Sequence, residues 1–186
     1  MYAVENCFHW IGFHIVNRLL EEGCRVDGID DLSTEKKENL AMFVGRNELF
    51  RHLPVIQESS GYNAIITVDD QMVKMHREEP VTIQLPLLFG EWMPMNQDGV
   101  YNGDEFVPFA AKEFTSRAVY IDDFLTGFLQ WLQASSLPSE LNVKSVHDKS
   151  AEDARHEHFL FIRNQQPLEE SIQSVKNHYR NYKKFY

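Results

Sequence analysis

Hydrophobic residues near the start of the chain change their spacing twice, which predicts a strand, a helix and a second strand. Residues 2–4 form a short apolar run, and residues 25–29 form another. Between these runs, apolar residues recur at the spacing of a helix with one core-facing side: Ile11, Ile15, Val16, Leu19 and Leu20. Gly23 is placed to end this helix, because glycine tolerates the left-handed conformation after a last turn. The unit is typical of a doubly wound parallel sheet with a right-handed crossover.

The pattern predicts further elements along the chain. Residues 35–44 are expected to form a short helix, and residues 49–56 a strand that Pro54 breaks or ends. Amphipathic helices are predicted over about 122–132, where Asp122 is placed to cap the first turn, and over about 168–182. We therefore expect a single compact α/β domain over 1–186, with a core over 1–90 and further segments over 91–186.

Composition limits the classes of function. The chain has 186 residues, 28 acidic against 18 basic side chains and a formal charge of −10, which argues against binding the phosphate backbone of nucleic acids. No apolar run is long enough for a bilayer, and the N-terminus lacks the basic and apolar regions of a signal peptide. Cys7 and Cys24 flank the first helix, where a disulfide is not expected, so we predict a reduced, cytoplasmic protein with no membrane partner.

The loop before the first helix, residues 6–12, and Asp30 after the second strand have the layout of a nucleotide site. Together they resemble the extended short-chain dehydrogenase/reductase family, the NAD-dependent nucleotide-sugar epimerases and dehydratases. Three glycines mark this loop in the family, and their positions fall on Asn6, His9 and Gly12. Asp30 falls where the family's acidic residue accepts hydrogen bonds from the adenosine ribose. The resemblance implies a Rossmann-like fold in which Gly12 and Asp30 are remnants of a cofactor site.

The likeness continues to about residue 182, but whole elements are missing. It implies a longer helix over residues 62–77 and another strand over residues 81–90. Tyr62 falls on the catalytic tyrosine of the family's Tyr-x-x-x-Lys helix, Ile66 on its lysine, and Asp70 on an acidic position one turn later. The implied protein is degenerate and internally truncated, with remnants of a small C-terminal substrate lobe. Either the strand leading to Phe89 moves beside the first strand, or an edge is left for a partner to cover. We favour the first arrangement.

The substitutions argue against the family's redox cycle. An unperturbed tyrosine has a pKa of about 10 and is a poor base at neutral pH without a nearby cation, which Ile66 does not supply. The alternative interpretation of Tyr62 is a residue kept for packing or hydrogen bonding. Side chains at Asn6 and His9 would project into the space of the pyrophosphate, so we expect no cofactor, or NAD if any is bound. Asp30 alone is equally compatible with a polar strand end.

These observations leave several functional hypotheses. The first is a pseudoenzyme that binds a protein partner or itself, and the loop of Trp92, Met93 and Met95 is a candidate exposed apolar contact. The second is an enzyme or binder of NAD or a nucleotide-sugar that uses Gly12, Asp30 and Tyr62. The third is a metal site around His156 and His158, near His147 and Asp148. That segment has the charge pattern of a solvated surface, so we predict no metal site.

Overall fold

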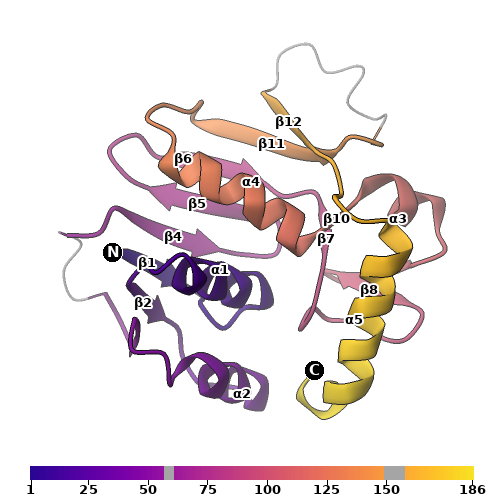
Figure 1. The fold of residues 1–186 in the computed structure, drawn as a ribbon, viewed down its shortest axis with the longest axis horizontal. Coiled ribbons are helices and arrows are strands. Elements are labelled where there is room, and N and C mark those ends of the chain that lie inside the picture. Colours follow the sequence, from indigo (N-terminus) through magenta and orange to yellow (C-terminus); the bar gives the residue numbers. More distant parts are fainter. Residues whose placement is uncertain (57–60, 149–157) are drawn as a thin grey trace. The chain divides into compact units, whose positions relative to one another are not determined.

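The computed structural model describes residues 1–56, 61–148 and 158–186, and its contacts divide the chain into two compact units. The first unit is Met1–Thr82 and the second is Ile83–Tyr186. The strand β6 (Val81–Gln84) contains the boundary. Each unit combines helices with mainly parallel strand pairs (Figure 1), which confirms the mixed α/β class.

The first unit is built on strands in the order β5-β4-β1-β2-β3. Its elements are β1 (Tyr2–Glu5), α1 (Trp10–Glu21), β2 (Val26–Ile29), α2 (Glu35–Val44), β3 (Phe50–Leu53), β4 (Ala64–Val68) and β5 (Met72–His76). The strand β1 pairs in parallel with β2 and β4, β2 pairs in parallel with β3, and β5 runs antiparallel to β4. The order β3-β2-β1 is that of one βαβαβ half of a doubly wound sheet, and β4 lies on the other side of β1.

The helices of this unit form where the sequence predicts them. The apolar side of α1 is buried, including Ile11, Ile15 and Leu19, and α1 packs on β1 and β2. Gly23 follows the helix at φ 72°, which confirms its role as the residue that ends it. Before α2, Thr34 accepts a hydrogen bond from the Lys37 N–H through its side chain, as an N-cap does.

The helix predicted over residues 62–77 is wrong. The chain forms the antiparallel strands β4 and β5 there, joined by a turn in which Asp69 Oδ1 accepts hydrogen bonds from the N–H groups of Gln71 and Met72. Ile66 and Val73 do reach the core, but they do so at strand spacing. The run from Ala64 to Val68 is rich in β-branched residues, which favour strands.

The neighbour expected for the first strand is also wrong. The strand beside β1 is β4, with Tyr2 opposite Ala64 and Glu5 opposite Thr67. The strand β7 (Leu87–Phe89) pairs instead with β10 (Ala118–Tyr120) in the second unit. Residues that resemble the family's catalytic helix therefore fill the place beside β1.

The described residues of the second unit include parallel and antiparallel strand pairs. The pairs β10–β7 and β11–β12 are parallel, and β8–β9 is an antiparallel hairpin. Its remaining elements are β8 (Gly99–Asn102), β9 (Glu105–Pro108), α3 (Lys112–Arg117), α4 (Ile121–Gln133), β11 (Glu140–Ser145), β12 (Phe159–Ile162), α5 (Leu168–Tyr182) and η2 (Lys183–Phe185). The helix α4 packs on β7, β10 and β12.

Two further predictions in this unit are wrong. The N-cap of α4 is Tyr120, so Asp122 lies in the first turn of the helix and does not cap it. Trp92, Met93 and Met95 are buried, so they form no exposed apolar loop. The Trp92 N–H donates a hydrogen bond to Tyr186 Oη over 2.9 Å, and the two rings stack with centroids 5.4 Å apart.

Candidate functional site

The β1–α1 loop (residues 6–9) lies at the carboxyl end of β1, where open α/β sheets bind their ligands. Asn6 takes the position of the first family glycine and adopts φ 56°, a left-handed conformation that asparagine tolerates better than most residues. Gly12 lies in the first turn of α1. A Cβ built on Gly12 would stand 2.2 Å from the Asn6 carbonyl oxygen, so only glycine fits there. The loop therefore keeps the backbone geometry that the sequence predicts at Gly12.

The side chains at the other two glycine positions cross to the end of β4. Asn6 Nδ2 donates a hydrogen bond to the Val68 carbonyl oxygen over 2.7 Å. His9 Nε2 donates to Asp70 Oδ1 over 2.9 Å, and Asp70 lies in the turn between β4 and β5. Between β1 and β4 the strand order reverses, and this point is where a dinucleotide enters such a sheet. The two hydrogen bonds, from Asn6 and from His9, therefore cross the place that a dinucleotide takes in such a sheet.

The N–H groups of the loop are also used within the protein. The Cys7 N–H donates to the Ile29 carbonyl over 3.3 Å, and the His9 N–H donates to the Asn6 carbonyl over 2.9 Å. The Phe8 N–H donates to Asp30 Oδ2 over 2.9 Å. A phosphate-binding loop directs such N–H groups toward its anion. In this chain, all three are directed toward protein acceptors.

Asp30 is buried and forms several hydrogen bonds at the end of β2. Its Oδ1 accepts from the Asp31 N–H over 2.8 Å and from Lys37 Nζ over 2.6 Å. Burial opposes the charge of Lys37, but its hydrogen bonds to Asp30 and Asp31 raise its pKa. Hydrogen bonds from Lys37 and Ser33 lower the pKa of Asp31 to about 2. The carboxylate predicted to meet a ribose is thus bound to two backbone N–H groups and an ammonium group of the same chain.

Aromatic rings fill the space next to Asp30. The Phe8 ring lies 5.1 Å from the His52 ring and 6.4 Å from the Phe50 ring, measured between centroids. His52 Nε2 donates to the Asp30 carbonyl oxygen over 2.9 Å. A Cβ on Gly28 would stand 2.6 Å from the Phe50 ring, so this glycine lets the ring approach β2. These contacts join the loop, β2 and β3 into one packed group.

His9 is held in its neutral form. Burial lowers its pKa, although the hydrogen bond to Asp70 acts in the opposite direction. Its Nδ1 atom is buried and has no hydrogen-bond partner among the described residues. A proton on Nδ1 would have no acceptor there, so the geometry also favours the uncharged ring.

Tyr62 lies at the opposite edge of the sheet. It precedes the amino end of β4, where the Asn63 N–H donates to the Met1 carbonyl, whereas Gly12 and Asp30 lie at the carboxyl edge. Tyr62 Oη donates to Asp27 Oδ2 over 2.6 Å, and Arg51 binds both oxygens of Asp27. Burial and the Asp27 carboxylate raise the pKa of Tyr62, which is the wrong direction for a base. The structure brings Gly12 and Asp30 together and leaves Tyr62 away from them.

The metal hypothesis concerns His147, Asp148, His156 and His158. His147 and His158 are described, whereas His156 lies outside the described residues. Asp148 pairs with Arg117, with Oδ2 3.7 Å from Nε. Over residues 1–56, 61–148 and 158–186, no group of three His, Cys, Asp or Glu side chains has the arrangement of a metal site.

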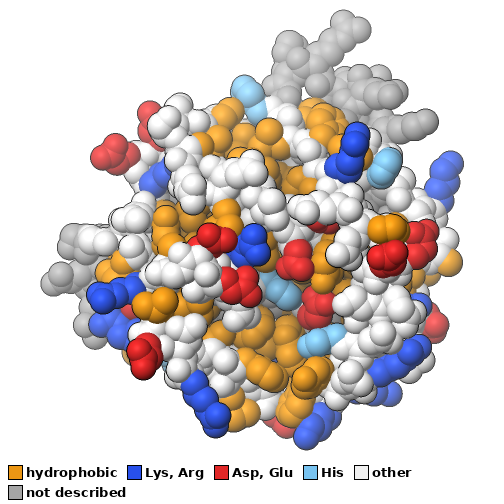
Figure 2. All heavy atoms as spheres, in the orientation of Figure 1, with side chains coloured by type: hydrophobic (Ala, Val, Ile, Leu, Met, Phe, Trp, Pro, Cys, Tyr) orange, Lys and Arg blue, Asp and Glu red, His pale blue; other side chains and the backbone are white. Residues whose placement is uncertain are grey.

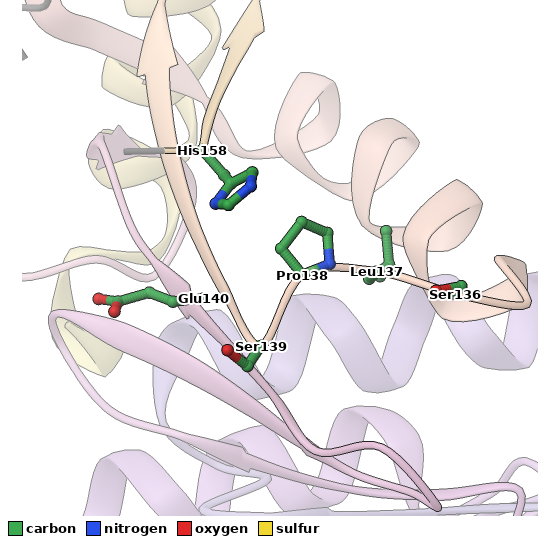
Figure 3. A pocket seen from close by; sticks show the side chains of 6 residues that line it. All are labelled: Ser136, Leu137, Pro138, Ser139, Glu140 and His158. Atoms are coloured by element: carbon green, nitrogen blue, oxygen red, sulfur yellow. The ribbon is translucent and has the colours of Figure 1, made fainter. Parts of the chain in front are cut away.

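A pocket of about 610 Å³ opens in the second unit between the α4–β11 connection and the start of β12. Its lining is Ser136, Leu137, Pro138, Ser139, Glu140 and His158 (Figure 3). Glu140 points away from the imidazole of His158 in this view, and its Oε1 accepts a hydrogen bond from Gln84 over 3.2 Å. The serine, histidine and carboxylate groups are therefore not arranged as a hydrolytic triad. Of the lining residues, His158 belongs to the metal-site hypothesis.

The charged side chains and the helices add two observations. On the face drawn in Figure 2, basic side chains are interspersed with acidic and hydrophobic ones. No helix in the described part of the chain has both the length and the apolar composition that a membrane crossing needs.

Comparison with known proteins adds no family. No protein-family model matches this sequence, and no curated protein matches it. The resemblance to nucleotide-sugar epimerases and dehydratases therefore remains a prediction from residues 6–12, Asp30 and the later motifs.

Sequence reasoning missed three residues that complete this site: Phe8, Lys37 and His52. Lys37 had a local signal, because it follows Asp30 and Asp31 and lies in the turn after the Thr34 cap. Phe8 and His52 are distant in sequence, so only the parallel pairing of β2 with β3 brings them together. The family pattern includes both His9 and Asp70, but it does not predict the hydrogen bond between them.

Proposed function

We propose that this chain is a degenerate, epimerase/dehydratase-like protein that performs no redox catalysis and acts by binding a protein, either another chain or a second copy. The observation that supports this proposal best is the internal bonding of the β1–α1 loop. Its N–H groups at 7, 8 and 9 and the Asp30 carboxylate all have protein partners. A dinucleotide would have to displace these bonds and the two links to β4 before it could bind.

The separation of Tyr62 from the loop supports the same proposal. Hydride transfer in the resembled family needs the tyrosine beside the nicotinamide, and therefore at the carboxyl edge of the sheet. Tyr62 lies at the amino edge and has a raised pKa. No lysine stands at position 66, which is Ile66 in the core of β4.

The alternative function is binding of NAD or a nucleotide-sugar with a reduced site. The strand order β3-β2-β1-β4, the close approach at Gly12 and the place of Asp30 at the end of β2 favour it. The first turn of α1 also has N–H groups that no intrahelical carbonyl accepts, and an anion could meet them there. In both cases we propose a reducing, cytoplasmic setting, because Cys7 and Cys24 are free thiols.

Titration of the purified protein with NAD and with UDP-glucose, followed by thermal unfolding, separates the two functions. Under the leading proposal neither compound raises the melting temperature. Under the alternative, ligand at about 100 times the dissociation constant stabilises the fold by about 2.7 kcal/mol. The His9→Ala/Asp70→Ala variant tests whether the side-chain links from the loop to β4 keep a ligand out. It removes one of the two links and leaves the hydrogen bonds of the loop N–H groups in place.

Light scattering on the eluting protein distinguishes the kinds of partner. A mass of twice the chain that falls on dilution indicates a second copy, and a monomer at every concentration indicates a different protein. NAD that remains bound through purification would contradict the leading proposal in either case.

A further inference from the structure

We propose that the tip of the β8–β9 hairpin, residues 101–106, binds an arginine- or lysine-bearing segment of a protein partner. This inference rests on the proposed protein-binding function and names the surface and the chemistry of the partner. It belongs to the second unit and uses none of the residues of the β1–α1 loop.

The hairpin tip presents an aromatic pair to solvent. Tyr101 and Phe106 are directly opposite in the register of the two strands, and their ring centroids are 5.2 Å apart. Their exposed fractions are 41% and 38%, so the two rings form a contiguous apolar surface that a partner could contact. The turn between them includes Gly103 at φ 60°, a conformation that favours glycine.

The opposite face of the hairpin is firmly anchored. Val100 and Val107 are also directly opposite each other, and both are buried. A Cβ on Gly99 would stand 2.4 Å from the Val107 carbonyl oxygen and 2.8 Å from the Phe106 ring. The Phe106 ring therefore covers Gly99, and the aromatic pair is presented on a fixed support. A preformed surface loses little conformational entropy when it binds.

The chemistry around the rings favours a cation. Two exposed carboxylates belong to the tip, Asp104 in the turn and Glu105 next to Phe106, and a third, Asp98, directly precedes β8 at the base of the hairpin. Among the described residues, none of the three forms an ion pair. An aromatic face attracts a guanidinium or ammonium group, and nearby carboxylates add charge attraction. The formal charge of −10 acts in the same direction at longer range.

Lysine side chains lie over three other aromatic rings of the same unit. Lys176 Nζ lies 4.7 Å from the Phe109 ring centroid, Lys144 Nζ 4.6 Å from that of Phe159 and Lys184 Nζ 4.5 Å from that of Phe185. Among the described residues, no cation lies over Tyr101 or Phe106. A partner's arginine or lysine would complete at the hairpin tip the contact that these lysines make elsewhere.

Fluorescence anisotropy tests the proposal with a labelled peptide of alternating arginine, leucine and glycine, and with its counterpart in which glutamate replaces arginine. We expect the arginine peptide to bind and the glutamate peptide not to bind. The Tyr101→Ser/Phe106→Ser variant should bind the arginine peptide about tenfold more weakly. The Asp104→Asn/Glu105→Gln variant should bind less tightly at low salt and lose most of its salt dependence. Phe161→Ser is the matched control, because it removes an exposed ring of β12 and should leave binding unchanged.

Three results would overturn the inference: no binding of the arginine peptide to the unmodified chain, equal binding of the glutamate peptide, or undiminished binding by the serine variant with its thermal unfolding intact. Equal competition by a neutral oligosaccharide would assign the rings to sugar stacking and overturn it as well. The NAD titration is read separately. A chain that binds both NAD and the arginine peptide overturns the proposed loss of cofactor binding and leaves the hairpin assignment standing.

Discussion

The β1–α1 loop and the hairpin tip differ in whether their polar and aromatic groups contact other parts of the protein or solvent. In the loop, the N–H groups at 7–9, the Asp30 carboxylate and the rings of Phe8 and His52 contact other parts of the first unit. At the hairpin tip, Tyr101, Phe106 and the neighbouring carboxylates face solvent. Groups that are already bonded stabilise the fold, whereas groups left open are available to a partner. Of the two regions, the loop that resembles a ligand site is therefore the one whose groups already have partners within the protein.

The most severe test of the loop is Gly12→Ala. Its methyl group would overlap the Asn6 carbonyl oxygen, so we expect a loss of about 3 kcal/mol in unfolding free energy, measured in urea. Gly23→Ala is the control: it has open space but a positive φ, and should cost about 1 kcal/mol. Equal losses would mean that close approach at Gly12 is not what fixes the loop.

Asp30→Ala distinguishes a structural carboxylate from a ribose-binding one. It leaves the buried Phe8 N–H without its acceptor, so we expect the free energy of unfolding to fall by about 2 kcal/mol without any ligand present. The exposed Asp31→Ala variant should change it by less than about 0.5 kcal/mol. If the Asp30→Ala variant is as stable as the unmodified protein, the carboxylate is not needed for folding, and this result would favour the alternative, nucleotide-binding function.

Tyr62→Phe tests the predicted catalytic residue as a structural one. Loss of the 2.6 Å bond to Asp27 should lower the unfolding free energy by about 1 kcal/mol. Under the leading proposal the variant changes no ligand response, because Tyr62 lies at the opposite edge from the loop. A ligand-binding defect without loss of stability would contradict this interpretation.

His9→Gln should change how stability depends on pH. The folded-state pKa of His9 lies below its ordinary value of 6.5, so the unfolded chain takes up a proton first as the pH falls, and the folded form loses stability. Between pH 7 and pH 6 this single group accounts for about 0.7 kcal/mol at most. Glutamine keeps a donor for Asp70 but does not titrate, so its curve should be flatter by that amount. Parallel curves would show that His9 is not held neutral.

The smallest effect is expected at the hairpin tip. Tyr101→Ser loses one cross-strand aromatic contact, so the free energy of unfolding should fall by less than about 1 kcal/mol. A larger loss in thermal unfolding would mean that the ring belongs to the core, and the contrast between the two regions would no longer hold.

Several elements could be predicted because their signals are local. The apolar side of α1, the end of that helix at Gly23 and the amphipathic helix α5 all follow from short-range spacing. The turn at 69–72 had a local signal as well, since Asp69 bonds the N–H groups of Gln71 and Met72. The helix prediction failed there because it followed the resemblance to a helical motif, whereas the β-branched run of Ala64–Val68 favours a strand.

The α/β class, the β1–α1–β2 unit and the glycine at position 12 could be predicted from the chain alone, because periodicity and backbone geometry act over a few residues. The pairing of strands across the fold was needed to show that β4 lies beside β1 and that Asn6 and His9 bond to its end. The same pairing places Tyr62 and Asp30 at opposite edges of the sheet. These outcomes depend on which strand fills an open place in the sheet, and that competition is settled by total burial and hydrogen bonding rather than by any one segment.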